Sequence, residues 1–97
     1  MASVFSAPGG VRIRYAVAGE GPVVLFLHAF PLGLWMWDAQ AIALAATHRV
    51  VRFDARGFGE SELGDGPLTM ERIADDGAAL LDHLGLGQAV VVGCSMG

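Results

Sequence analysis

The sequence contains no lysine and a single cysteine, and each scarcity excludes a class of protein. Without lysine, the chain has no phosphate-binding loop of the Gly-Lys-Ser/Thr kind. The only basic residues besides histidine are six scattered arginines, and the formal net charge is -4. We therefore expect no nucleic-acid partner, because phosphate backbones are bound by clustered basic side chains. Cys94 alone allows no internal disulfide, which is compatible with the cytoplasmic location that we predict.

Long apolar runs are also missing. The longest are of strand length, well short of the ~20 residues that cross a bilayer, so we expect no membrane partner. Residues 1–5 lack the basic segment and apolar run that begin a secretory signal. With 54% hydrophobic and 16% charged residues the chain is too apolar for disorder, and 97 residues allow one small domain.

Strand signals recur along the chain. Residues 11–17 alternate apolar and polar side chains, as in a half-buried strand, and a Pro-Gly-Gly turn before them makes residues 3–6 the other arm of a hairpin. Residues 23–27 and 89–92 are apolar throughout, which is typical of strands buried on both faces. Residues 49–53 form a further candidate strand.

Two helix signals separate the later strands. Residues 35–46 are rich in alanine, and a helix there would place Trp35, Ala39, Ile42 and Ala46 on one face. Residues 70–84 show apolar positions at helical spacing, with Thr69 as the N-cap. Gly77 lies inside this helix, where it favours a close approach to the sheet. The alternation predicts an α/β fold with a mostly parallel sheet, flanking helices and an N-terminal hairpin.

The strongest motif follows the last strand. Residues 93–97, Gly-Cys-Ser-Met-Gly, fit the Gly-x-Ser-x-Gly turn that places a serine hydroxyl above the carboxyl edge of such a sheet. The small residues two positions on either side of Ser95 let strand and helix pass each other. We therefore predict that Ser95 is a nucleophile on a strained turn with positive φ, against the alternative of an ordinary glycine-rich turn with a capping serine.

Two further motifs make a family resemblance specific. Residues 28–31, His-Ala-Phe-Pro, resemble the His-Gly-x-Pro segment of α/β-hydrolases, with Ala29 in place of glycine. Residues 54–61 closely resemble the family's Asp-x-Arg-Gly-x-Gly-x-Ser loop. The chain is similar to small bacterial esterases, 3-oxoadipate enol-lactonases and cofactor-free haloperoxidase-like enzymes. The resemblance implies that the backbone N–H groups of Phe30 and Met96 form the oxyanion hole, and that the Phe30–Pro31 bond is cis.

The same resemblance implies a hydrolase that acts on a small carboxylic ester or lactone through an acyl-enzyme at Ser95, with no cofactor and no metal. Residues 1–97 are then a partial domain that stops at the nucleophile turn, because the family places its acid and its histidine base later in the chain. We expect this chain alone to be inactive and to self-associate through an exposed sheet edge.

Several alternatives stay open. Perhydrolysis and carbon–carbon bond hydrolysis use the same groups, and a non-catalytic scaffold or binding domain can have the same fold. Relatives with an aspartate nucleophile, the dehalogenases and epoxide hydrolases, are disfavoured because serine occupies the centre of the turn. We interpret His28 as structural, His48 and His83 as surface residues, and Asp54 and Arg56 as loop-forming.

Overall fold

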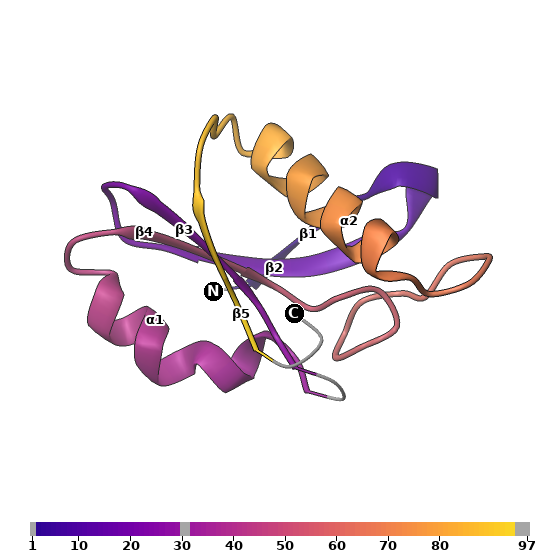
Figure 1. Ribbon diagram of the computed structural model, residues 1–97, viewed down its shortest axis with the longest axis horizontal. Coiled ribbons are helices and arrows are strands. Elements are labelled where there is room, and N and C mark those ends of the chain that lie inside the picture. The colour runs from indigo at the N-terminus through magenta and orange to yellow at the C-terminus, as the bar shows by residue number, and fades with distance from the viewer. Residues whose placement is uncertain (1, 30–31, 95–97) are drawn as a thin grey trace.

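The computed structural model describes residues 2–29 and 32–94. Within them, five strands form one sheet and two α-helices pack on it (Figure 1). The strands are β1 (Ala2–Ser6), β2 (Arg12–Ala18), β3 (Val23–Leu27), β4 (Arg49–Phe53) and β5 (Val90–Gly93). The helices are α1 (Asp38–Leu44) and α2 (Met70–His83), and short 3-10 helices occupy Pro8–Gly10 and Leu34–Trp37.

The strand order is β1-β2-β4-β3-β5. The first two strands form the expected hairpin, and β2 also pairs antiparallel with β4. The other pairs, β3 with β4 and β3 with β5, are parallel. The chain moves from β3 outward to β4 and then returns across β3 to β5. Since crossovers of this kind are right-handed, the reversal places α1 and α2 on opposite faces of the sheet, as Figure 1 shows.

Alternation along β3 supplies both faces of the core. Leu25 points to the α2 side, where it packs with Phe53 and Leu80. Val24 and Phe26 point to the α1 side. All three β3 side chains are buried, which confirms the interpretation of residues 23–27 as a strand covered on both faces. Strand β3 is paired on both sides and covered on both faces, so its carboxyl end is held in place. The candidate site begins at this end.

The helix predicted over residues 35–46 is wrong in extent and in its buried face. The α-helix covers only Asp38–Leu44, and Leu34–Trp37 is a 3-10 helix. The apolar side chains that pack on the sheet are Trp37, Ala41 and Leu44, while Trp35 and Ile42 are exposed. Both sets of residues have helical spacing, so the pattern alone does not select the buried face. The sheet selects it, because the Trp37 ring packs on Phe26 of β3 with ring centroids 4.6 Å apart.

Helix α2 agrees with its prediction at both ends. The Thr69 hydroxyl oxygen accepts a hydrogen bond from the Arg72 N–H at 3.2 Å, and Gly85 follows the helix with a positive φ of 72°. The expectation that Gly77 favours a close approach of the helix to the sheet is not supported. A methyl group there would meet Leu25 at 3.4 Å and Phe53 at 3.5 Å, which are ordinary contact distances.

Candidate functional site

The carboxyl ends of β3 and β5 lie side by side. Their parallel register pairs Leu27 with Gly93, so the segments that follow these two residues leave the sheet next to each other. The strand order also reverses here, because β4 lies on one side of β3 and β5 on the other. Ligands of open α/β sheets bind in the crevice at such a reversal. The sequence motifs that follow β3 and β5 therefore begin at one place.

The proposed nucleophile and oxyanion donors, Ser95, Phe30 and Met96, lie outside the described residues. The same holds for the backbone conformation of Ser95 and for the Phe30–Pro31 bond. The structure does describe His28 and Ala29 of the His-Ala-Phe-Pro motif and the residues that follow Pro31. It also describes Cys94, which precedes the predicted nucleophile and is exposed. The surroundings of the site can thus be built from residues 28–29, 32–34 and 54–61.

His28 is buried, and both of its ring nitrogens have partners. The Ala55 N–H donates to Nε2 at 2.9 Å, so Nε2 must carry a lone pair. The proton of the neutral ring is therefore on Nδ1, which lies 3.0 Å from the Ala29 carbonyl oxygen and donates to it. A ring held in this way has no free lone pair with which to take a proton from a serine. The geometry supports the structural interpretation of His28.

The Ala29 carbonyl accepts a second hydrogen bond. The Leu32 N–H donates to it at 2.8 Å. The Ala29 N–H donates in turn to the Met36 sulfur at 3.1 Å. The segment after β3 is thus held by hydrogen bonds on both sides of Ala29.

Asp54 lies at the carboxyl end of β4 and is buried. Its Oδ1 accepts the Leu34 N–H at 2.7 Å, and its Oδ2 accepts the Glu60 N–H at 3.0 Å. Its carbonyl oxygen accepts the Ser61 hydroxyl at 2.6 Å. All of these partners are backbone or hydroxyl groups of neighbouring loops. The arrangement agrees with the loop-forming role that the sequence suggested for Asp54.

Arg56 and Asp76 form a buried ion pair. Arg56 Nε donates to Asp76 Oδ2 and Arg56 Nη2 to Asp76 Oδ1, each at 2.7 Å, and the two side chains are 2% and 0% exposed. These hydrogen bonds raise the pKa of Arg56, although burial acts in the opposite direction. The pair fixes the loop after β4 to α2, which agrees with the loop-forming interpretation of Arg56.

Sequence reasoning missed Asp76. A signal was present, because Asp76 is three residues after Ile73 and directly precedes Gly77, both of which are buried on the inner face of α2. A carboxylate at such a position needs a buried cation as partner. The sequence alone did not identify Arg56 as that cation.

His48 and His83 are remote from the site. His48 immediately precedes β4 and His83 ends α2, so both lie at the amino end of the parallel strands. His83 is exposed, as predicted, whereas His48 is half-buried and its Nδ1 lies 2.7 Å from the Thr47 hydroxyl. Neither ring is available at the carboxyl ends of β3 and β5.

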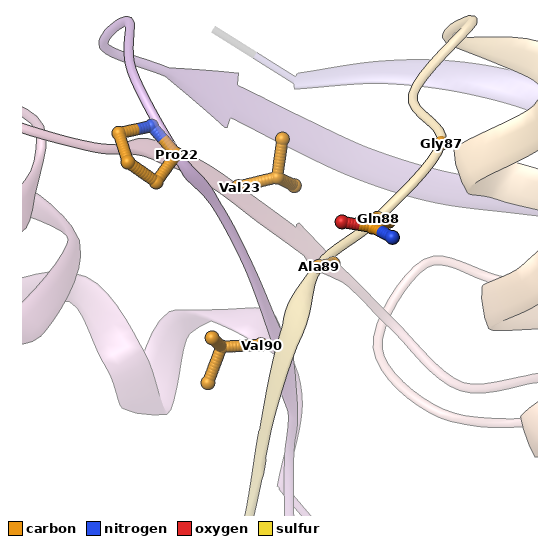
Figure 2. A pocket seen from close by; sticks show the side chains of 6 residues that line it. All are labelled: Pro22, Val23, Gly87, Gln88, Ala89 and Val90. Carbon is orange, nitrogen blue, oxygen red and sulfur yellow. The ribbon is translucent and has the colours of Figure 1, made fainter.

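A hollow at the opposite end of the sheet is not a continuation of the site. Figure 2 shows it between the start of β3 and the segment that leads into β5. Its lining residues are Pro22, Val23 and the run Gly87–Val90. It therefore lies at the amino ends of the strands whose carboxyl ends carry the motifs.

No group of three or more His, Cys, Asp or Glu side chains among residues 2–29 and 32–94 is arranged to hold a metal ion. No helix in the same part of the chain is long and apolar enough to cross a membrane.

Known proteins of one family resemble this chain. The family model of the alpha/beta hydrolase fold matches residues 22–97. Epoxide hydrolase 1 of Siraitia grosvenorii is 39% identical over 90 residues, which are 90% of this chain and 29% of that protein. The 3-oxoadipate enol-lactonase 2 of Acinetobacter baylyi is 35% identical over 89 residues, which are 90% of this chain and 33% of that protein.

A solved structure is similar to this chain in both sequence and fold. The thermophilic esterase from Thermogutta terrifontis has a TM-score of 0.90 to this chain and is 41% identical, with 99% of this chain and 37% of the esterase covered. The chain thus spans about a third of the length of these relatives. The matching model, the relatives above 30% identity and the shared topology lead to one conclusion: this chain belongs to the alpha/beta hydrolase fold family.

Proposed function

We propose that these residues are the N-terminal part of a serine hydrolase that acts on a carboxylic ester or lactone. The observation that carries the proposal is the position of the Gly-Cys-Ser-Met-Gly run, which begins at the last residue of β5, beside the carboxyl end of β3. A serine in this run would stand over the crevice where the strand order reverses. The similarity to an enol-lactonase and an esterase supports the substrate class.

The proposed reaction has two halves. The Ser95 oxygen bonds to the substrate carbonyl carbon as its proton passes to a base. The tetrahedral oxyanion then collapses and breaks the bond to the alcohol oxygen, which takes up the proton; an ester releases this alcohol, whereas a lactone keeps it on the acyl group. Water then attacks the acyl-enzyme in the same way and releases the acid. The N–H groups of Phe30 and Met96 would stabilise the negative oxygen in both halves, and one such donor is typically worth ~3 kcal/mol.

The base and its carboxylate partner are proposed to come from sequence beyond these residues. The fold orders its triad as serine, then acid, then histidine. His28 already uses both nitrogens within the described chain, and His48 and His83 lie at the other end of the sheet. The share of each relative that the chain covers, about a third, is consistent with a larger domain.

The similarity to an epoxide hydrolase suggests an epoxide as the substrate. The identity of residue 95, at the centre of the Gly-x-Ser-x-Gly run, favours an ester or lactone instead. Epoxide hydrolases of this fold are expected to attack with an aspartate, which carries a nucleophilic oxygen without a base. Serine is a weak nucleophile until a base removes its proton, and its usual target is a carbonyl carbon. Residue 95 is serine, so we favour acyl transfer.

The experiment uses the complete product of the reading frame that encodes these residues. We expect it to hydrolyse a short-chain activated ester and to be labelled at Ser95 by a fluorophosphonate, and we expect Ser95→Ala to lose both properties. Loss of the histidine base in a serine hydrolase lowers kcat by about 10⁶, so the 97-residue chain by itself should show only background rates. An intact product that is neither labelled nor active would support the scaffold alternative instead.

A rate in the 97-residue chain that is well above background and absent from Ser95→Ala would contradict part of this proposal. One of the three histidines would then act as the base. Turnover of an epoxide that survives in Ser95→Ala would contradict the acyl-enzyme itself.

A further inference from the structure

Two aspartates of this chain are followed directly by glycine, at Asp65–Gly66 and at Asp76–Gly77. Such a pair can react with itself without an enzyme, because glycine has no side chain to keep its backbone nitrogen away from the aspartate carboxyl carbon. The nitrogen bonds to this carbon, a water leaves, and a five-membered succinimide ring forms. The sequence does not distinguish the two pairs, but their surroundings in the fold do.

The pair in α2 is protected from this reaction. The Asp76 side chain is fully buried, and each of its carboxylate oxygens accepts a hydrogen bond from Arg56 at 2.7 Å. Gly77 lies inside α2, where a backbone N–H donates to the carbonyl four residues earlier. The nitrogen and the carboxyl carbon cannot meet unless the helix opens, so we expect almost no reaction here while the protein is folded.

The pair in the loop before α2 is open. Residues 62–69 belong to no helix or strand, and both Asp65 and Gly66 are exposed. Among the hydrogen bonds and ion pairs of the described residues, none involves the Asp65 carboxylate or the Gly66 N–H. The two groups that must meet therefore break no contact with this part of the chain, and water can reach the ring that they form.

The fold requires glycine at the reactive position. Gly66 has a φ of 85°, in the left-handed region that favours glycine. A Cβ added there would also lie 2.8 Å from Arg72 Nη1, which is closer than real contacts. The residue that lets the loop pass beneath Arg72 is thus the one that leaves its own nitrogen unhindered.

Arg72 is placed to decide how the ring opens. Its Nη1 donates to the backbone carbonyl oxygen of Asp65 at 2.6 Å and to that of Pro67 at 3.1 Å. The Asp65 backbone carbonyl is one of the two carbonyls of the succinimide. Water that attacks it breaks its bond to the Gly66 nitrogen and leaves isoaspartate, in which this carbonyl has become a free carboxylate. Attack at the other carbonyl restores aspartate. A guanidinium on the backbone oxygen favours the first path, because it pairs with the carboxylate that forms.

We propose that Asp65–Gly66 is a site of spontaneous isomerisation to isoaspartate, and that Arg72 directs the ring opening towards this product. Nothing is oxidised or reduced, and the water that leaves when the ring closes is replaced by the water that opens it. The product keeps the mass and the net charge. Its backbone is longer by one carbon at residue 65, and its negative charge has moved from the exposed side chain to the side of Arg72. This site is independent of the proposed hydrolase reaction.

The test ages the complete reading-frame product at neutral pH in water enriched in heavy oxygen, so that each ring opening labels the new carboxylate. Digestion in ordinary water with a protease that cleaves after glutamate places the two pairs on different peptides, because Glu62 and Glu71 flank the first pair. Electron-transfer fragmentation then distinguishes isoaspartate from aspartate. We expect label at residue 65 to appear at least about tenfold faster than at residue 76, because α2 must open before Asp76 reacts.

Asp65→Ser is the control for the first peptide, because it removes the reacting carboxyl group and should abolish the label there. Equal rates at residues 65 and 76, or no label at residue 65, would overturn the proposed site.

A further variant tests the role of Arg72. Arg72→Gln removes the cation, and we expect the ratio of labelled isoaspartate to labelled aspartate at residue 65 to fall about twofold, as for the loss of an exposed ion pair. Arg12→Gln is the matched control, because Arg12 is an exposed arginine on β2. Slow labelling at residue 76 reports in each variant that α2 is intact. An unchanged ratio in a folded Arg72→Gln, or an equal fall in both variants, would overturn the directing role.

Discussion

At the scale of single residues, the polar side chains that are buried among residues 2–29 and 32–94 fix loops to strands and helices. His28 and Asp54 join the loops after β3 and β4, and Arg56 fixes the second of these loops to Asp76 in α2. Motif reading located three of the four, because they sit directly after strands. It missed Asp76, whose position on the inner face of α2 was the available signal, and it could not identify Arg56 as the partner, since a pair across the fold has no fixed spacing in the sequence.

The buried pair gives a stability prediction. Asp76→Asn removes one charge and leaves the Arg56 guanidinium buried without a counter-charge, so the free energy of unfolding should fall by about 3–5 kcal/mol. Asp38→Asn is the matched control, because the Asp38 side chain is 64% exposed and its pair with Arg52 should contribute at most ~1 kcal/mol. Urea unfolding of the two variants checks the difference. An equal loss of unfolding free energy in the two variants would mean that the buried pair contributes no more to stability than the exposed pair.

The same pair fixes the expected pH dependence. The pKa of Arg56 is raised in the folded state, so its contribution to stability is fully present below its unfolded pKa and is lost only as pH rises through the raised folded value. Arg56 should therefore cause no loss of stability between neutral pH and about pH 10.

At the scale of elements, apolar patterns predicted the strands and their approximate bounds. Residues 23–27 and 49–53 are strands over those spans, and residues 11–17 and 89–92 are shifted by one residue. The extent and buried face of the alanine-rich helix α1 were harder to predict, because its small side chains mark the buried face weakly. The strand order could not be obtained from the patterns either, since neighbours such as β2 and β4 meet only through the tertiary fold.

Helix α2 carries a prediction about its inner glycine. Gly77→Ala should raise the free energy of unfolding by about 0.5–1 kcal/mol, because alanine favours the helix and its methyl group fits at ordinary contact distance from Leu25 and Phe53. Gly85→Ala should have the opposite sign, since Gly85 has a φ of 72° after the helix. Thermal melts of both variants test these two expectations. A lower melting temperature for Gly77→Ala would show that the glycine is needed for packing after all.

At the scale of the whole molecule, the described sheet has an apolar edge at β5. Val90 and Val91 are 64% and 56% exposed, although the sequence of this strand predicts burial on both faces. Strand β5 pairs only with β3 among the described strands. Unpaired apolar edges are templates for association between chains.

The 97-residue chain should therefore self-associate in solution. A charge at the edge should oppose this, so Val91→Lys is expected to shift light scattering towards monomer. Ile42→Lys is the control, because Ile42 is 79% exposed on α1, away from the sheet edge. A parent chain that is monomeric and melts cooperatively would contradict the expectation. An equal effect of both lysines would mean that general apolar exposure, and not the edge, drives association.

The pairing of Leu27 with Gly93 has a consequence for the time course of folding. The two residues flank the same crevice, yet a strand and two helices lie between them in the chain. Closing so long a segment has an entropic cost that local contacts do not offset, so pairings of this type tend to form late and slowly. On the ribosome, β3 leaves the exit tunnel before its neighbour β5 has been made. We expect the crevice to be the last part of these residues to assemble, and conservative truncations in β5 to change the unfolding rate more than the folding rate.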